Sequence, residues 1–342
     1  MISEIASKHW SELSDEELLT WRICDLRLTI AGTDLEKAVA TLHRELSAKG
    51  IVFHPPCYLG DEWFCPDGVP VIAIPFFLAH PRLKQLEKKM ILEVEGAIEE
   101  DCLRLLRHEA GHSINYAYAL HRRKKWRELF GNFSDDYPET YRPHPYSKRF
   151  VRHLDNWYAQ YHPDEDFAET FAVWLQPNFP WREYYQGWKA LEKLEYVDQL
   201  MKEIAGKPAK VEGGKRICEA DKLRTTLDTY YRRKRKLYGP DLPGFYDRDL
   251  QRIFPKLPEQ VKSEAASKFI RRHRQEILTS VSRWTGEPKL MISRLLTSLI
   301  ERCRELDLRA SESQLALQVD IAAYLTMLTM NYRQHGKFVR IP

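Results

Sequence analysis

The sequence has no long hydrophobic run, no close pair of cysteines and no strong excess of charge of either sign. No stretch approaches the about 18 continuous apolar residues of a membrane-spanning helix, and residues 1–20 lack the basic start and apolar run of a secretory signal. The 6 cysteines include no CxxC pair, so we interpret them as reduced thiols of a cytoplasmic protein. These absences argue against a membrane protein and against a secreted, disulfide-stabilised one.

The composition that is present suits a folded protein with a real core. The chain has 342 residues, of which 43% are hydrophobic and 12% aromatic. Its 53 basic and 49 acidic residues nearly balance. Two basic runs, Arg232–Lys236 and Arg271–Arg274, favour solvated helix faces over a nucleic-acid site, because the two runs would have to align in space to form one patch. We therefore expect neither a nucleic-acid nor a membrane partner, and the sequence does not determine the oligomeric state.

The composition and the hydrophobic pattern change twice along the chain, which predicts three segments. Residues 1–50 read as an N-terminal helical segment that ends at Gly50. Residues 51–210 hold recurrent Pro and Gly, short apolar runs and long helical patterns, and form the expected core. The boundary at 206–214 is poor in apolar residues. Residues 211–342 read as a helical C-terminal region, with helices over about 217–238, 256–282, 288–308 and 311–332.

Two strands and two helices are expected within the core segment. Val69–Ile74 and Met90–Val94 are short apolar runs that predict strands. A long helical pattern covers 98–120, and Pro163 opens another helix. Between these helices, 131–162 reads as a long loop, and loops of that length are usually functional.

The run His108-Glu109-Ala110-Gly111-His112 carries the chemistry of a metal site. Residues four apart share a helix face, so His108 and His112 can hold one ion, and imidazole is a favoured zinc ligand. Glu109 lies about 100° around the helix, where it can reach a water molecule without coordinating. The small Gly111 can let another segment pass close to the ion.

A third protein ligand is expected from the helix that begins at Pro163. Glu165 and Glu169 are four residues apart and share a face of this helix. One carboxylate can bind zinc, and the other can accept the second N–H of a histidine ligand. The metzincin pattern is excluded, because Asn115 and Tyr118 stand where it requires Gly and His.

These motifs resemble the zinc-binding metallopeptidase family of bacteria, of the gluzincin type. The likeness rests on His108–His112 followed by Glu165–Glu169, and extends to flanking segments such as 61–68, 79–83 and 171–175. A more distant similarity links the two active-site segments to the anthrax lethal factor protease and the Mlc titration factor peptidase. The resemblance implies an α+β, helix-rich fold: a zincin-like metallopeptidase domain with a small sheet, followed by a helical C-terminal region.

The resemblance also assigns roles to individual residues. It makes Glu165 the third zinc ligand, with Asp166 as the alternative, and Glu169 the partner of a histidine ligand. It places Tyr158 at the position that stabilises the oxyanion, with Tyr161 as the competitor. Glu109 would activate a zinc-bound water and then protonate the leaving amine.

The predicted function is zinc-dependent hydrolysis of a peptide or protein substrate, with Zn²⁺ as the cofactor. Two alternatives stay open: a non-catalytic zinc-containing binding or regulatory protein, and a metal-dependent amidase that acts on a non-peptide substrate. A structural zinc site usually has four protein ligands, so three candidates together with Glu109 favour catalysis.

Overall fold

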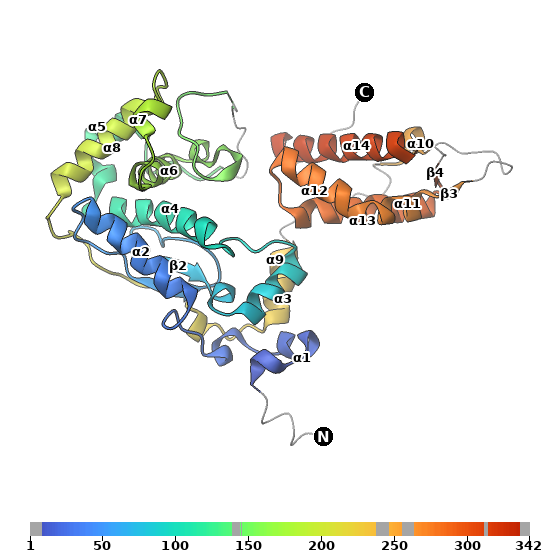
Figure 1. The fold of residues 1–342 in the computed structure, drawn as a ribbon, viewed down its shortest axis with the longest axis horizontal. Coiled ribbons are helices and arrows are strands. Elements are labelled where there is room, and N and C mark those ends of the chain that lie inside the picture. Colours follow the sequence, from blue (N-terminus) through green and yellow to red (C-terminus); the bar gives the residue numbers. More distant parts are fainter. Residues whose placement is uncertain are drawn as a thin grey trace. The chain divides into compact units, whose positions relative to one another are not determined.

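The chain divides into two compact units: the first lies within residues 1–230, and the second consists mainly of residues 231–342, together with the short segment Ile91–Glu93. The computed structural model describes residues 9–138, 144, 146–236, 246–254, 263–310 and 314–335. Each unit has its own set of packed helices (Figure 1).

The first unit contains a small parallel sheet. Strand β1, Cys57–Gly60, pairs with β2, Ile72–Pro75, so that Tyr58 lies opposite Ala73. All of β2 is buried, which explains why it reads as a continuous apolar run rather than an alternating one. Phe64 adds an isolated antiparallel bridge to Ala73.

Helix α4, Glu99–Tyr118, is the central element of this unit. It packs against α6, Pro163–Leu175, and also contacts α2, Asp34–Ala48, and β2 (Figure 1). Acidic residues fill the first turn of α4, where the helix dipole favours them. The other helices described in this unit are α1 Asp15–Leu19, α3 Pro81–Ile91, α5 Lys124–Phe130, α7 Trp181–Tyr184, α8 Ala190–Ile204 and the start of α9 Leu227–Lys236.

Local sequence signals explain where α6 begins and why it lies inside the unit. The His162 side chain accepts a hydrogen bond from the backbone N–H of Asp164, and Pro163 occupies the first helical position, where no N–H is needed. Phe167 and Phe171 are fully buried. The acidic residues of α6 are buried as well, and buried carboxylates require partners.

The second unit is a helical assembly with its own core. Residues of α11, α12, α13 and α14 bury a shared apolar cluster that includes Phe269, Ile292 and Leu325. A two-residue antiparallel pair joins β3 to β4. The elements described here are α10 Asp247–Ile253, β3 Glu264–Ala265, α11 Ala266–Arg272, α12 Arg274–Thr285, α13 Lys289–Glu305, β4 Arg309–Ala310 and α14 Gln314–His335.

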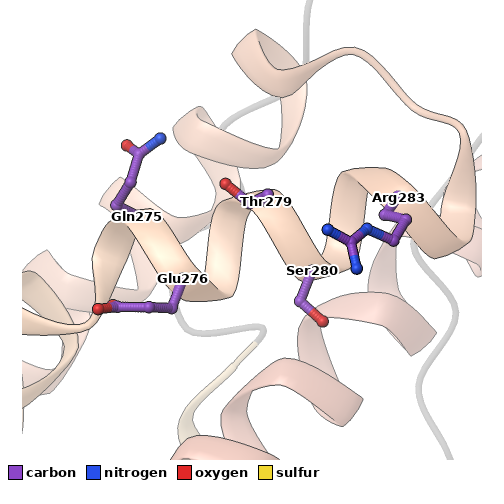
Figure 2. Close-up of a pocket in the computed structure, with 5 residues that line it drawn as sticks. All are labelled: Gln275, Glu276, Thr279, Ser280 and Arg283. Carbon is purple, nitrogen blue, oxygen red and sulfur yellow. The ribbon is translucent and has the colours of Figure 1, made fainter.

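A shallow depression of about 330 Å³ lies on α12 (Figure 2). All the residues that line it come from this one helix and end in polar groups: Gln275, Glu276, Thr279, Ser280 and Arg283. It has none of the converging apolar walls that enclose a small-molecule ligand, so we assign no function to it.

The prediction of a helix-rich α+β fold with a small sheet is confirmed, whereas the predicted strand Met90–Val94 is wrong. Helix α3 continues through Ile91, and the left-handed φ of 70° at Leu92 ends it. Leu83 and Leu86 are fully buried at helical spacing, so amphipathic packing overrides the local β propensity of the run. The division into 1–50, 51–210 and 211–342 stays a prediction.

The first predicted C-terminal helix starts later than expected. Helix α9 begins at Leu227 rather than near 217, because residues 223–226 form backbone hydrogen bonds and a bridge with 21–24. Parts of the other predicted helices, at 237–238, 256–262 and 311–313, lie outside the described residues.

Candidate metal centre

Helices α4 and α6 approach each other closely at Gly111. A Cβ atom built on Gly111 would lie 2.7 Å from the Cα of Ala168 and 3.0 Å from its carbonyl oxygen. Real side chains do not tolerate such a distance to a backbone. The absence of a side chain at 111 therefore lets the two helices bring their polar faces together, as the sequence indicated.

We expect Gly111→Ala to destabilise the first unit despite the better helix propensity of alanine. Alanine favours a helix over glycine by about 1 kcal/mol, but the added methyl must push α6 away, and overpacking of this kind costs about 1–3 kcal/mol. The displaced α6 should also bind metal more weakly. Thermal melting and zinc affinity measure the two effects.

Gly213→Ala is the matched control, because a Cβ at Gly213 meets nothing within 4 Å. Its stability should change by less than about 0.5 kcal/mol. Equal behaviour of the two variants would contradict the close contact between α4 and α6.

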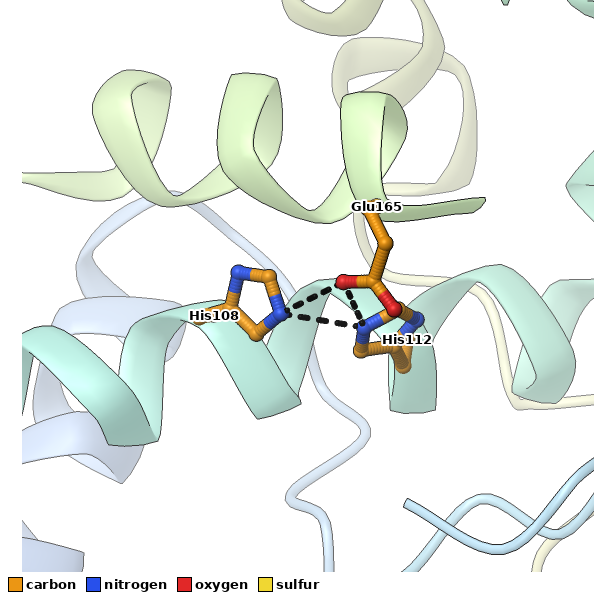
Figure 3. Close-up of side chains that lie close together, drawn as sticks. All are labelled: His108, His112 and Glu165. Carbon is orange, nitrogen blue, oxygen red and sulfur yellow. Dashed lines mark hydrogen bonds and ion pairs between the residues drawn. The ribbon is translucent and has the colours of Figure 1, made fainter. Parts of the chain in front are cut away.

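Three side chains from these helices converge on one point. His108 and His112 point from α4 toward Glu165 of α6 (Figure 3). The Nε2 atoms of the two histidines are 3.1 Å apart, and Glu165 Oε2 lies 3.0 Å from His108 Nε2 and 3.3 Å from His112 Nε2. All three residues are buried.

The other ring nitrogen of each histidine is held by a carboxylate. His108 Nδ1 lies 2.9 Å from Glu169 Oε1, and His112 Nδ1 lies 2.8 Å from Asp164 Oδ2. Each Nδ1–H donates to its carboxylate, so in the neutral imidazoles both Nε2 atoms carry lone pairs. Carboxylates commonly orient histidine ligands of metals in this way.

This donor set fits a zinc ion. Two ligand atoms at about 2.0–2.1 Å from a tetrahedral zinc lie about 3.3 Å from each other, close to the three distances found. Two imidazole lone pairs and a carboxylate oxygen repel one another unless a cation stands between them. The Oε2 atoms of Glu165 and Glu109 are also buried without a hydrogen-bond donor among the described residues.

The pKa values of the site also favour a bound cation. Burial lowers the pKa of His108, but Glu165 and Glu169 outweigh it and raise this pKa to about 9. The site therefore favours positive charge at the imidazoles, supplied by protons or by a metal ion. Burial raises the pKa of Glu109, whereas His108 and His112 lower it.

The sequence did not single out Asp164. Besides His112, this carboxylate accepts hydrogen bonds from Asn115 Nδ2 at 2.8 Å and from the Tyr116 hydroxyl at 2.7 Å. Asn115 and Tyr116 lie three and four residues after His112. Two side chains that can donate hydrogen bonds, on a helix expected to be buried, were the signal in the sequence that a buried acceptor lies nearby. That acceptor, Asp164, lies 49 residues after Asn115, which local spacing cannot reveal.

Glu169 and Asp166 occupy different surroundings. Glu169 Oε2 accepts the backbone N–H groups of His153 and Leu154, which fix the carboxylate that holds His108. Asp166, the alternative ligand, instead pairs with Lys193 at 2.5 Å. Burial raises the pKa of Asp166 to about 7, although Lys193 opposes this.

Two tyrosines border the site from the loop before α6. The Tyr137 hydroxyl donates to Glu165 Oε1 at 2.9 Å, and its ring stacks on His162; sequence reasoning missed this residue. Tyr158 lies in a short 3₁₀ segment, Asp155–Gln160, with its ring centroid 5.7 Å from that of His108. Tyr161, its competitor, donates to the Pro138 carbonyl.

Comparisons with known proteins agree with the residues at this centre. The family model described as "Putative zinc-binding metallo-peptidase" matches residues 100–178, which include both helices of the site. No curated protein matches the chain. No solved structure matches either, so the distant similarity to the anthrax lethal factor protease and the Mlc titration factor peptidase stays a prediction.

Within the described residues, no helix is long and apolar enough to cross a membrane. The match over α4 and α6 confirms the resemblance inferred from the sequence. Over residues 100–178, less than half of its length, the chain is similar to the family described as a putative zinc-binding metallo-peptidase.

Proposed function

We propose that the protein is a zinc-dependent peptidase, with His108, His112 and Glu165 as its metal ligands. The observation that carries the proposal is the convergence of three buried donor atoms within 3.0–3.3 Å, while both histidines are held through their other nitrogen. The proposal extends to a cytoplasmic location and to residues 51–210 as the metallopeptidase core.

The number of ligands supports catalysis over a purely structural zinc. The group that can hold a metal has three members among the described residues, whereas structural sites usually close with four, often cysteines. A fourth position that stays open to solvent or substrate is the mark of a hydrolytic centre.

The residues of the chain can divide the work of hydrolysis. Zinc at this site would supply Lewis acidity for the water and for the scissile carbonyl. Glu109 takes the proton of the attacking water on its carboxylate, which burial makes more basic, and then passes it to the leaving amine nitrogen. Tyr158 donates its hydroxyl proton as a hydrogen bond to the developing oxyanion.

The test is hydrolysis of a defined peptide library by the purified protein, followed by mass spectrometry. We expect cleavage that 1,10-phenanthroline abolishes and that stoichiometric Zn²⁺ restores. Zinc binding without peptide cleavage, but with turnover of small amides, would favour the amidase alternative. Zinc binding without turnover of either substrate class would favour a binding protein.

A further inference from the structure

The two oxygens of the Glu165 carboxylate have different surroundings. Oε2 lies 3.0 Å from His108 Nε2 and 3.3 Å from His112 Nε2, and it is buried without a hydrogen-bond donor among the described residues (Figure 3). Oε1 instead accepts a hydrogen bond from the hydroxyl of Tyr137 at 2.9 Å. One oxygen of this carboxylate therefore faces the metal position, and the other is held by a tyrosine.

The ring of Tyr137 packs on a histidine whose orientation is fixed. It stacks on His162 with 3.9 Å between the ring centroids and 14° between the ring planes. His162 Nδ1 accepts the backbone N–H of Asp164 at 3.1 Å, so in the neutral ring Nε2 carries the proton and donates to the carbonyl oxygen of Asp135 at 2.8 Å. Rotation of the His162 ring would therefore break two hydrogen bonds.

The loop around Tyr137 is attached to the first unit on both sides of this residue. Before it, Phe133 stacks on His121 with 4.2 Å between the ring centroids. After it, the Pro138 carbonyl accepts a hydrogen bond from the Tyr161 hydroxyl at 2.9 Å, and the Tyr161 ring packs edge-on against that of Tyr137 at 5.5 Å. Tyr137 is 48% exposed, yet these contacts fix its ring and direct its hydroxyl to the carboxylate.

Tyrosine is a neutral donor, which distinguishes Glu165 from the acidic residue that follows it. Asp166 pairs with Lys193, so its negative charge is compensated within the protein. Tyr137 orients the Glu165 carboxylate without cancelling its charge, because a tyrosine hydroxyl keeps its proton at neutral pH. Glu165 therefore retains the charge that attracts a cation to the two neutral imidazoles.

The hydrogen bond from Tyr137 also affects how many coordination positions Glu165 can occupy. A carboxylate binds a metal ion through one oxygen or through both. A catalytic zinc has three protein ligands and one open position, and a second oxygen from Glu165 would crowd that position. Hydrogen bonds to an ionised carboxylate are stronger than those between neutral groups, so the contact from Tyr137 opposes metal binding through Oε1.

We propose that Tyr137 is a positioning residue of the metal centre: its hydroxyl holds Oε1 of Glu165, so that Glu165 binds the ion through Oε2 alone. The inference rests on the proposed zinc site and deepens it, because it explains how a coordination position stays open. Tyr137 thereby differs from Tyr158, which is proposed to contact the oxyanion directly.

The test variant is Tyr137→Phe in the full chain, which removes the hydroxyl and keeps the ring that stacks on His162. The dissociation constant for Zn²⁺ is measured by competition with a fluorescent chelator. We expect zinc to bind about 10–100-fold more weakly, the usual effect of removing a hydrogen-bond partner of a metal ligand. The carboxylate is then no longer held in its orientation before the ion arrives.

A second measurement replaces zinc by Co²⁺ and records its visible absorption, which is stronger for four-coordinate than for five-coordinate cobalt. The wild type should give the intense spectrum of a four-coordinate ion. In Tyr137→Phe the absorption should fall, because Oε1 is free to bind as well. A residue that merely supported the loop would not change the coordination number in this way.

Tyr146→Phe is the matched control, because it removes a hydroxyl from a 93% exposed tyrosine of the same loop. Its zinc affinity and cobalt spectrum should equal those of the wild type. Tyr158→Phe should also keep both, but it should cleave peptides more slowly, which separates a positioning role from a direct one. Circular dichroism checks that each variant folds.

An unchanged zinc affinity and cobalt spectrum in Tyr137→Phe would overturn the proposal while leaving the ligand set intact, because the wild type would still bind zinc. Slower peptide cleavage with both metal readouts unchanged would also overturn it and would assign the hydroxyl to the reaction itself. An equal loss of affinity in Tyr146→Phe would overturn it in favour of a general effect of the loop. A wild type that binds no zinc would overturn both this inference and the proposed function.

Discussion

Glu109→Gln is expected to keep its zinc and to lose peptide hydrolysis by about 10²–10⁴-fold, the range that a positioned general base contributes. The substitution preserves the shape of the side chain and removes only its ability to take a proton. Glu109 is 6% exposed and lies beside the two histidines, but it is not one of the three residues proposed to bind the metal. In this variant, elemental analysis should therefore find an unchanged zinc content, whereas the rate of peptide cleavage should fall.

Glu100→Gln provides the control, because Glu100 is an exposed residue in the first turn of the same helix. It should leave both zinc content and rate unchanged. A Glu109→Gln protein with full activity would refute the role of this residue. A Glu109→Gln protein that has lost its zinc would instead show that Glu109 helps to hold the ion.

Glu165→Ala is expected to abolish stoichiometric zinc binding. The wild type should carry about one zinc ion per chain, and the variant retains only two imidazole donors and no anionic ligand, too few for a stable site. Elemental analysis after dialysis measures this directly. Asp164→Asn should have a milder effect: loss of the carboxylate that orients His112 should weaken zinc binding by about 10–100-fold.

Glu195→Ala removes an exposed carboxylate from α8 and should not affect zinc content. The order Glu165→Ala, then Asp164→Asn, then Glu195→Ala is the expected ranking of zinc loss. Full zinc content in Glu165→Ala would contradict the proposed ligand set, and the donors would then have to be sought elsewhere.

Local chemistry explains why much of this centre could be predicted from the sequence. The i, i+4 spacing of His108 and His112 requires only that residues near 110 form a helix, and the helix is present. Proline at 163 predicted the first residue of α6. The structure then brings Glu165 to the histidines and Glu169 to His108, as the resemblance implied.

What could not be predicted depends on contacts between distant segments. Asp164 reaches His112, and Tyr137 reaches Glu165, only after α4, α6 and the intervening loop have packed. The strand expected at Met90–Val94 failed for the same reason, because packing of Leu83 and Leu86 decides the conformation of that run.

The carboxylates that α6 places at the site would make the stability of the first unit depend on metal binding. This single helix carries Glu165, the proposed acidic ligand, and both carboxylates that hold the histidines, while α4 carries both imidazoles. A metal ion bound by residues of both helices would cross-link segments more than 50 residues apart in the chain. Such a cross-link restricts the unfolded chain, as a disulfide bond does. Stripping the metal should then loosen the whole α4–α6 pair at once, and the unit should become easier for other proteases to digest.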